Sequence, residues 1–200
     1  KKRGTIMVKK NIFVIENGEK YYGTGDYFDE IDYQKLKKIY YSYKQLNEEI
    51  MSLESRRTNL PEIISEGLAC ILFNACRTNN KKFKCHSSFD CVDENGTSYQ
   101  IKAVSTLSKN EEGGPTSFGP KSEWDKLVLM HFICENDIVE IYLFDKNIQD
   151  IYVNKTQTFA EQCLQGRRPR FSLLKKCHEM EIVPFMTFSF KEDKIIDKNI

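Results

Sequence analysis

The chain has 200 residues, of which 40% are hydrophobic and 12% aromatic. This length suits one domain with a sizeable core, and Phe and Tyr throughout the chain argue against disorder. Thirty Lys and Arg residues nearly balance 29 Asp and Glu residues. A surface for nucleic acid must therefore come from local clustering of basic residues. No apolar run is long enough to span a bilayer, and we expect no signal peptide.

The cysteines indicate a reducing compartment. There are seven, no C-x-x-C pair occurs, and several lie in apolar runs, as Cys70 does. We therefore expect small buried hydrophobic residues in a cytoplasmic protein. A zinc site at Cys85-His86 or Cys177-His178 is the alternative, although its spacing differs from that of a zinc finger.

A hairpin and a long helix are predicted first along the chain. Residues 6–23 contain Asn17-Gly18, a dipeptide typical of hairpin turns. Apolar residues then recur at helical spacing over 32–55, and the other face of this helix is rich in Lys and Glu. Both elements are expected to be peripheral to the rest of the domain.

A second amphipathic helix is predicted to begin near Asn59, a suitable N-cap, with Pro61 in its first turn. Its apolar residues extend to Ala75. Glu62 and Glu66 are four positions apart and share a face of the helix. A solvated face near the helix N-terminus explains Glu62 better than Glu66, which lies one turn further in.

Core strands and two further helices are predicted for the C-terminal half. Phe118 and Trp124 are expected to be packing anchors, and His131 a satisfied core residue. In chain order, the predicted elements are a short helix opening at 122–125, strands over 127–133, 138–144 and 148–153, a helix over 156–164 ending at Gly166, and a strand over 182–190.

The segment 86–104 carries most of the chemical information. It is predicted to form a β-hairpin around an Asn-Gly turn. Asp90 lies on the first arm. Gln100 and Lys102 lie two residues apart on the second arm, so their side chains share a face.

The length of the hairpin loop decides whether Asp90 joins that face. A two-residue Asn-Gly turn puts Asp90 on the opposite face. A three-residue loop over Asn95–Thr97 sets Asp90 opposite Lys102, and a five-residue loop sets it opposite Gln100. We predict one of the two longer loops. An ordinary exposed hairpin remains the alternative for this segment taken alone.

These residue types suit magnesium-dependent phosphodiester hydrolysis. Mg²⁺ binds oxygen ligands and needs only one or two protein carboxylates. Asp90 would be the central ligand, with the Gln100 amide oxygen and the Ile101 backbone carbonyl as further ligands. Lys102 can orient the water or stabilise the phosphorane. Glu66 can restore the negative charge that Gln100 lacks.

An acidic helix residue, then Asp90, then Gln100-Ile101-Lys102 resembles the core of the PD-(D/E)XK nucleases. The further matching blocks are Asn59-Leu60-Pro61-Glu62 with Ser65-Glu66, Ser88-Phe89-Asp90, Thr116-Ser117-Phe118-Gly119-Pro120-Lys121 and Gln165-Gly166-Arg167-Arg168-Pro169-Arg170-Phe171-Ser172. Together, over roughly residues 30–175, they resemble a small group of type II restriction endonucleases. Its members are one-domain homodimers that cut GC-rich palindromes with an unspecified central base.

The resemblance implies an α/β fold with a central mixed β-sheet flanked by helices. It also implies Mg²⁺-dependent cleavage of double-stranded DNA within a bacterial restriction–modification system. We expect a single nuclease domain over 1–200. The helix over 32–55 is a candidate dimer element, because a palindrome calls for a two-fold dimer.

Basic and turn-rich blocks supply the expected DNA contacts, which are Arg167, Arg168, Arg170, Ser117, Lys121 and Lys84. Arginine pairs bidentately with guanine, and phosphate anchoring or a surface salt-bridge cluster is the alternative for any one of them. A surface turn is the alternative for Ser117 and Lys121, and a solvated loop for Lys84.

Two departures from the family pattern leave alternatives open. Ser88-Phe89-Asp90 lacks the proline of the motif, and Gln100 replaces its usual acidic residue, so either Glu62 or Glu66 would complete the site. The rival functions are a monomeric repair or nicking nuclease on the same core, a non-catalytic DNA-binding module, and an unrelated α/β domain with surface acids.

Overall fold

The computed structural model describes residues 7–16, 18–78, 89–120 and 123–199. It divides into two compact units, residues 1–99 and 100–200, and each is described by itself. The boundary falls within strand β5 (Ser98–Thr106), which therefore contributes to both units. Helices are interspersed among the strands along the chain, so the expected α/β class is confirmed, while the single domain stays a prediction.

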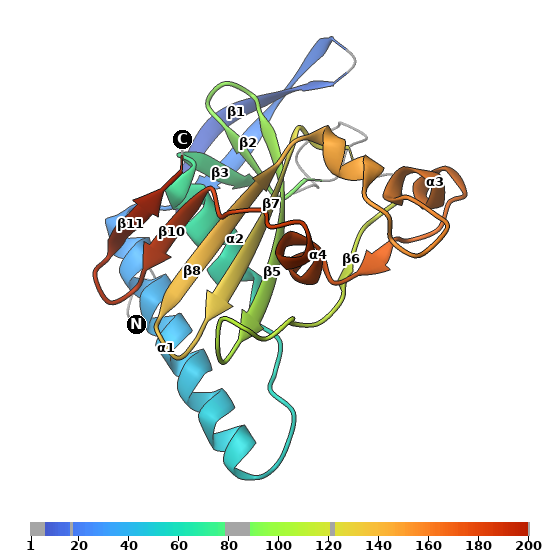
Figure 1. Ribbon diagram of the computed structural model, residues 1–200. Helices are drawn as coiled ribbons and strands as arrows, with labels where there is room; N and C mark the ends of the chain where they lie inside the picture. Colours follow the sequence, from blue (N-terminus) through green and yellow to red (C-terminus); the bar gives the residue numbers. More distant parts are fainter. Residues whose placement is uncertain (1–6, 17, 79–88, 121–122, 200) are drawn as a thin grey trace. The chain divides into compact units, whose positions relative to one another are not determined.

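The first unit is an antiparallel sheet with two helices. Its strand order is β1-β2-β3-β4-β5, and α2 packs against both α1 and β3 (Figure 1). Its elements before β5 are β1 (Val8–Glu16), β2 (Glu19–Tyr27), α1 (Glu30–Ser52), α2 (Glu62–Leu72), β3 (Ala75–Thr78) and β4 (Cys91–Asp93).

The N-terminal hairpin and the long helix are confirmed. Glu16 pairs with Glu19, so the hairpin turns at the predicted position. Helix α1 begins one residue after Asp29, whose carboxylate accepts the Asp32 N–H at 2.9 Å. This side-chain cap satisfies a backbone donor that the first turn of a helix leaves unpaired, which fixes where the helix starts.

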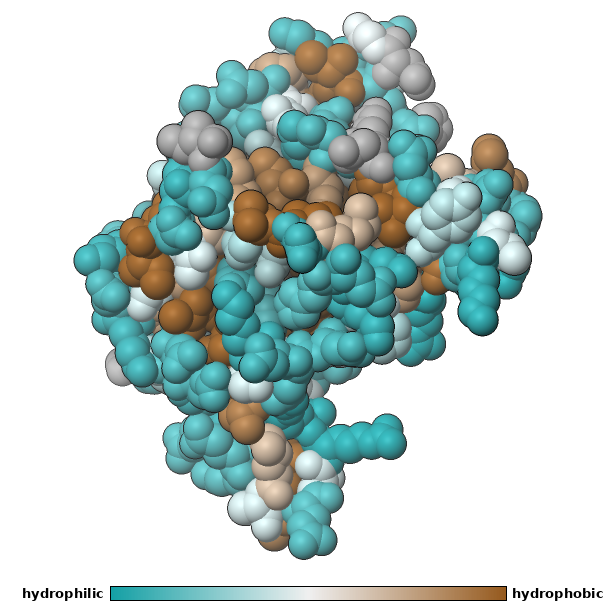
Figure 2. Space-filling model, viewed as in Figure 1, coloured by the Kyte–Doolittle hydropathy of each residue, from teal (hydrophilic) through white to brown (hydrophobic). Residues whose placement is uncertain are grey.

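One face of α1 remains exposed although it carries apolar side chains. Ile39 and Leu46 on α1 and Leu53, its C-cap residue, recur every seven residues and are 40%, 49% and 80% exposed. Figure 2 shows brown apolar surface among the teal hydrophilic surface where α1 lies in Figure 1. The opposite face is buried. A helix with a second apolar stripe presents surface that a partner can cover.

The connection from α1 to α2 is fastened by side chains of α1. The Asn47 amide oxygen accepts the Thr58 N–H at 2.6 Å, and the Tyr43 hydroxyl donates to the Thr58 carbonyl at 3.2 Å. Helix α2 then starts at Glu62 with Pro61 in the N-cap position and no side-chain cap. The predicted N-cap at Asn59 is therefore wrong, because the fixed φ of proline favours a helix start and needs no capping side chain.

The end of α2 also differs from the prediction. The helix stops at Leu72, and Asn74 adopts a left-handed φ of 48°. This conformation, which asparagine tolerates better than most residues, redirects the chain into β3. Ala75 therefore opens a strand that the sequence did not predict, rather than ending a helix.

The second unit consists of a mixed sheet and a separate two-stranded ribbon. The sheet has the order β5-β7-β8-β10-β11 and the ribbon pairs β6 with β9. In Figure 1, β5 and β7 point the same way, whereas the other neighbouring pairs are antiparallel. Its elements after β5 are β6 (Thr116–Ser117), β7 (Lys126–Ile133), β8 (Ile138–Phe144), the 3-10 helix η1 (Lys146–Asp150), α3 (Phe159–Leu164), β9 (Arg170–Phe171), α4 (Leu173–Glu179), β10 (Met186–Ser189) and β11 (Lys194–Lys198).

The two long core strands, β7 and β8, are confirmed. The helix predicted over 156–164 is confirmed in a shorter form: Thr158 caps it, and Gly166 follows its end with a φ of +69°. The strand predicted over 182–190 is confirmed only as the four residues of β10. Helix α4 and strands β6, β9 and β11 were not predicted.

Two other predictions for this unit are wrong. Residues 123–125 are not helical; Trp124 is buried just before β7. The strand predicted over 148–153 is a 3-10 helix at its start. Ile148 and Ile151 are three residues apart, which is the repeat of a 3-10 helix, so their apolar pattern fits that element as well as a strand.

Within the described ranges, no helix combines the length and apolar character that crossing a membrane requires.

Candidate active site and DNA-binding ribbon

The β4–β5 hairpin has the register of the longer, five-residue loop. Cys91 lies opposite Tyr99 and Val92 opposite Ser98, so paired residue numbers sum to an even number and residues 93–97 form the loop. A two-residue Asn-Gly turn, which gives an odd sum, is thereby excluded. The predicted longer loop is confirmed, while Asp90 itself lies just before β4, outside the paired residues.

Asp93 explains why the loop is longer than an Asn-Gly turn. Its carboxylate accepts the N–H groups of Asn95 and Thr97, both at 2.9 Å, and the Tyr99 hydroxyl at 3.1 Å. Gly96 follows with a φ of +86°, which suits glycine. An acidic side chain that bonds the backbone two residues on forms an Asx turn, a signal that the sequence contained.

The backbone at Asp90 is held from both sides. Its N–H donates to the Tyr99 carbonyl at 2.9 Å, and its carbonyl accepts the Thr78 N–H at 2.9 Å. The Thr78 hydroxyl reaches the Phe89 and Asp90 carbonyls at 3.0 and 3.1 Å. Asp90 is half-buried. Thr78, which sequence reasoning missed, therefore positions the residue predicted to bind metal.

Glu66 points to the same region of the first unit. It pairs with the Arg77 guanidinium. The pKa of the Cys91 thiol lies well above its ordinary value, because of a hydrogen bond with Cys70 and burial, and then because of nearby charges that include Asp90 and Glu66. Both carboxylates therefore act on one buried thiol.

Glu62 is exposed at the start of α2. Of the two glutamates left open by the sequence, Glu66 is the half-buried one, and it pairs with Arg77. This agrees with the solvated helix start expected for Glu62.

In the second unit, Gln100 and Ile101 are buried and Lys102 is half-buried on β5. The Lys102 ammonium lies 5.7 Å from the centre of the Phe118 ring, within the range of a cation–π interaction. Phe118 is buried, as expected of a packing anchor. The predicted catalytic lysine thus lies beside the turn-rich block that contains Phe118.

That block and the arginine-rich block form one ribbon, although some fifty residues separate them in the sequence. Ser117 lies opposite Arg170 and Thr116 opposite Phe171. The ring of Phe118 stacks on Phe171 with 5.5 Å between centroids. We call the paired strands β6 and β9, together with residues 167–169 that lead into β9, the recognition ribbon.

The recognition ribbon carries three exposed residues of the predicted DNA-binding set, Ser117, Arg168 and Arg170. Arg167 is exposed too, but its guanidinium donates to the Gln157 side-chain oxygen at 3.2 Å. Lys84 and Lys121, with the basic loop before the hairpin, lie outside the described residues.

Two contacts tie the loop before the ribbon to α4. The Lys175 ammonium binds the Glu112 carboxylate at 2.8 and 3.0 Å, and the Ser172 hydroxyl donates to the Glu112 carbonyl at 2.9 Å. Gly113 has a φ of +64°, and a Cβ there would lie 2.2 Å from Val104. The loop that leads to the ribbon is therefore held in place at two consecutive residues, Glu112 and Gly113.

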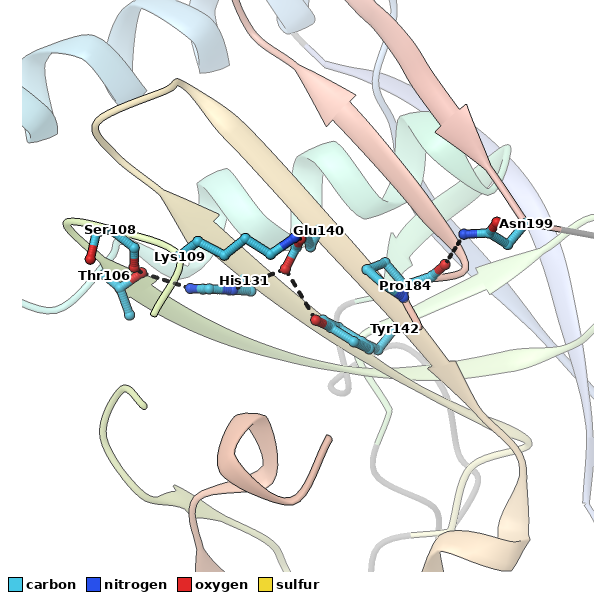
Figure 3. A network of polar contacts seen from close by, with 8 residues as sticks. All are labelled: Thr106, Ser108, Lys109, His131, Glu140, Tyr142, Pro184 and Asn199. Atoms are coloured by element: carbon cyan, nitrogen blue, oxygen red, sulfur yellow. Dashed lines mark hydrogen bonds and ion pairs between the residues drawn. The ribbon is translucent and has the colours of Figure 1, made fainter. Parts of the chain in front are cut away.

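A buried polar network anchors the start of the same loop (Figure 3). The Glu140 carboxylate pairs with the Lys109 ammonium at 2.6 Å, accepts the Tyr142 hydroxyl at 3.1 Å and faces the His131 ring at 3.4 Å. Burial raises the Glu140 pKa, but the hydrogen bonds from His131, Lys109 and Tyr142 outweigh it and lower the pKa to about 2. His131, fully buried, also contacts Thr106 at 2.6 Å, so the core role expected of it is confirmed.

Cysteines do not form a metal centre in the described part of the chain. None of the described cysteines is in a disulfide, and nowhere there do three His, Cys, Asp or Glu side chains converge to hold a metal ion. Zinc at Cys177-His178 is therefore unsupported, and Cys85-His86 lies outside the described residues. The magnesium set from the sequence has only two such side chains, Asp90 and Glu66.

Comparison with known proteins adds an independent observation. A family model described as Bsp6I restriction endonuclease matches residues 28–180. The chain belongs to this family. It is 31% identical over 174 residues to the type II restriction enzyme Bsp6I of Bacillus sp. (strain RFL6), and the match covers 84% of this chain and 94% of that protein.

Membership of the Bsp6I family confirms the resemblance drawn from the sequence motifs. The chain is a type II restriction endonuclease, a site-specific deoxyribonuclease of a restriction–modification system. The matched range contains the hairpin with Asp90 and Lys102 and the recognition ribbon. The N-terminal β-hairpin precedes it.

Proposed function

We propose that this endonuclease hydrolyses double-stranded DNA with Mg²⁺ at a site formed by Asp90, Gln100 and Lys102, with Glu66 in support. The observation that carries the proposal is the anchoring of Asp90 on the β4–β5 hairpin. Cys91 lies opposite Tyr99, and the Asp90 N–H also donates to the Tyr99 carbonyl. Asp90 is therefore held beside the residue that directly precedes Gln100 in the chain.

Strand alternation extends the argument to Lys102. β5 is one continuous strand from Ser98 to Thr106, so Gln100 and Lys102 present their side chains to the same face. The five-residue loop between β4 and β5 is one of the two that the sequence required for a shared site, and it supports the proposal.

The donor set fits Mg²⁺, a hard cation that prefers oxygen ligands. Asp90, Glu66, the Gln100 amide oxygen and the Ile101 backbone carbonyl would hold the ion. The region also accepts positive charge, since the Arg77 guanidinium already pairs with Glu66. Bound Mg²⁺ would supply a Lewis acid that neutralises phosphorane charge and lowers the pKa of its bound water.

The protein's own groups perform the remaining work. The Lys102 ammonium, a compact point charge, orients the attacking water or stabilises the charge on the phosphorane oxygens. Contact with the Phe118 ring at 5.7 Å restricts where that ammonium can lie. A restricted lysine loses less freedom when the substrate binds, which favours the productive geometry.

The recognition ribbon is the proposed reader of DNA sequence. A two-stranded β-ribbon fits the major groove, and arginine binds the O6 and N7 atoms of guanine bidentately. Arg168 and Arg170 are exposed on the ribbon, as a GC-rich site would require. Arg167, bound to Gln157, is better placed for support or phosphate contact.

Three broader proposals accompany this site. The order of helix α2, strand β4 and strand β5 supports a PD-(D/E)XK core within a single nuclease domain. A palindromic GC-rich target calls for a two-fold homodimer. The exposed stripe Ile39, Leu46 and Leu53 on α1, with the seven-residue spacing of a helix–helix seam, is the proposed contact between copies.

A plasmid digest tests the proposal. We expect purified wild type with Mg²⁺ to cut a sequenced plasmid on both strands at one short GC-rich sequence, which reading the ends identifies. Asp90→Asn should lose at least about a hundredfold in rate, the order expected for a group in the reacting centre. Glu94→Gln, which alters an exposed acid of the same hairpin, should retain activity.

Other outcomes would refute parts of the proposal. Cleavage by Asp90→Asn at the wild-type rate would remove Asp90 from the site. Nicking of one strand, with a monomeric mass in solution, would favour a monomeric nicking enzyme over a homodimer. DNA binding without cleavage at any Mg²⁺ concentration would show that this chain lacks catalytic activity.

A further inference from the structure

Arg77 occupies an unusual place for a surface-facing arginine. Its side chain, 33% exposed, pairs with the Glu66 side chain, which is 13% exposed. In the sheet, Arg77 lies opposite Asp26 on one side and opposite Cys91 on the other. Asp26 already has its own ion partner in Lys9. Arg77 therefore has two acids near it: Asp26, which lies opposite it in the sheet, and Glu66 on α2. Its guanidinium pairs with Glu66.

The surroundings explain why a cation is needed there. A carboxylate removed from water is costly unless it is paired. Glu66 is mostly buried, and its pairing with the Arg77 guanidinium supplies the positive charge that such a carboxylate needs.

We propose that Arg77 is a stand-in cation: it holds Glu66 in the metal-free enzyme and releases that carboxylate when Mg²⁺ binds. This inference rests on the proposed function, because it takes Glu66 as a metal ligand. Arg77 is then a positioning residue that holds the ligand near its working place. It also competes with the ion, since the guanidinium and Mg²⁺ cannot share the same carboxylate oxygen.

The direction in which Mg²⁺ affinity changes when Arg77 is replaced distinguishes this role from a purely structural one. If Arg77 competes with Mg²⁺, replacing it by a neutral residue makes the ion bind more tightly. If Arg77 only fastens α2 to β3, the same replacement misplaces Glu66 and makes the ion bind more weakly. Lysine at this position keeps the positive charge and should preserve the wild-type behaviour.

The test measures Mg²⁺ binding without DNA. The full chain is heated at increasing MgCl₂ concentration, and the rise in unfolding temperature reports binding of the ion to the folded state. We expect Arg77→Met to reach half of its maximal rise at a roughly tenfold lower Mg²⁺ concentration than wild type, the change expected on losing one charge-assisted contact. Arg77→Lys should match wild type, and Glu66→Gln should bind more weakly.

Unchanged or weaker Mg²⁺ binding by Arg77→Met would overturn the inference. Should that variant fail to fold, Arg77→Gln, which retains a hydrogen-bond donor without the charge, is judged by the same criterion. Failure of the proposed function gives a different pattern: wild type then shows no Mg²⁺-dependent rise and Asp90→Asn still cuts DNA. Loss of cleavage in Asp90→Asn with no tightening in Arg77→Met refutes only the Arg77 inference.

Discussion

Replacing Glu140 by Gln should lower stability in a pH-dependent way. In the native protein, hydrogen bonds from His131, Lys109 and Tyr142 favour the charged carboxylate and hold its pKa at about 2, below the ordinary 4.5. A carboxyl whose pKa falls on folding stabilises the native state at pH values above 4.5. That contribution disappears as the pH falls from about 4.5 to about 2.

The size of the effect follows from the pKa difference. Each pKa unit corresponds to about 1.4 kcal/mol, so the shift contributes about 3 kcal/mol at pH 7. At pH 3 the same relation leaves about 1 kcal/mol. The stability difference between wild type and Glu140→Gln should therefore shrink by about 2 kcal/mol between pH 7 and pH 3. Lys109 and His131 lose their charged partner in the variant, which adds a pH-independent cost.

Urea unfolding provides the assay. The single tryptophan of the chain, Trp124, is buried in the second unit, so its fluorescence reports the unit that contains Glu140. The control is Glu179→Gln, which breaks an exposed pair with Lys176 and should leave stability nearly unchanged at both pH values. A difference between wild type and Glu140→Gln that stays constant from pH 7 to pH 3 would refute the reasoning.

Three further predictions concern the site and the ribbon. Thr78→Val removes the hydroxyl that bonds the Asp90 backbone and should slow Mg²⁺-dependent cleavage about tenfold, whereas Thr78→Ser should restore the rate; equal rates for both variants would exclude this positioning role. Gly113→Ala should cost more than about 1 kcal/mol in urea unfolding, because its φ is positive and a Cβ has no space. Gly114→Ala, with open space around it, is the control and should be nearly neutral. Arg170→Ala should weaken binding to the target duplex by about 1–3 kcal/mol, and an equal loss on an unrelated duplex would identify a phosphate contact instead.

Sequence patterns predicted the elements whose signals are local. The helical period of apolar residues located α1, and apolar runs located β7 and β8, which are buried at nearly every residue. The helix predicted over 156–164 with its end at Gly166 located α3, and the capping box at Thr158 sets its start two residues later. The parity of the hairpin followed from strand geometry, and the observed register agrees with it.

Sequence patterns did not predict the elements that form only through tertiary pairing. β6 and β9 have two residues each, too few for a periodic signal, and they become strands only by pairing with each other. β3 was not predicted because its apolar residues continue those of α2 along the sequence. Only Asn74, with its left-handed backbone conformation, separates the two elements. Site residues that act on others were missed for the same reason. Thr78 and Arg77 have no motif, since their roles come from what lies opposite them.

The loop over 93–97 constrains how this protein can evolve. Loss or gain of a single codon there would turn the Asp90 side of the hairpin over relative to β5, whereas loss or gain of two codons would preserve the faces. Insertions in exposed loops are usually well tolerated, but this loop is expected to vary among family members only by even numbers of residues. Family members are then expected to preserve the length of this loop more than its amino-acid sequence. The Asp93 carboxylate, which binds two backbone N–H groups of the loop, maintains that length.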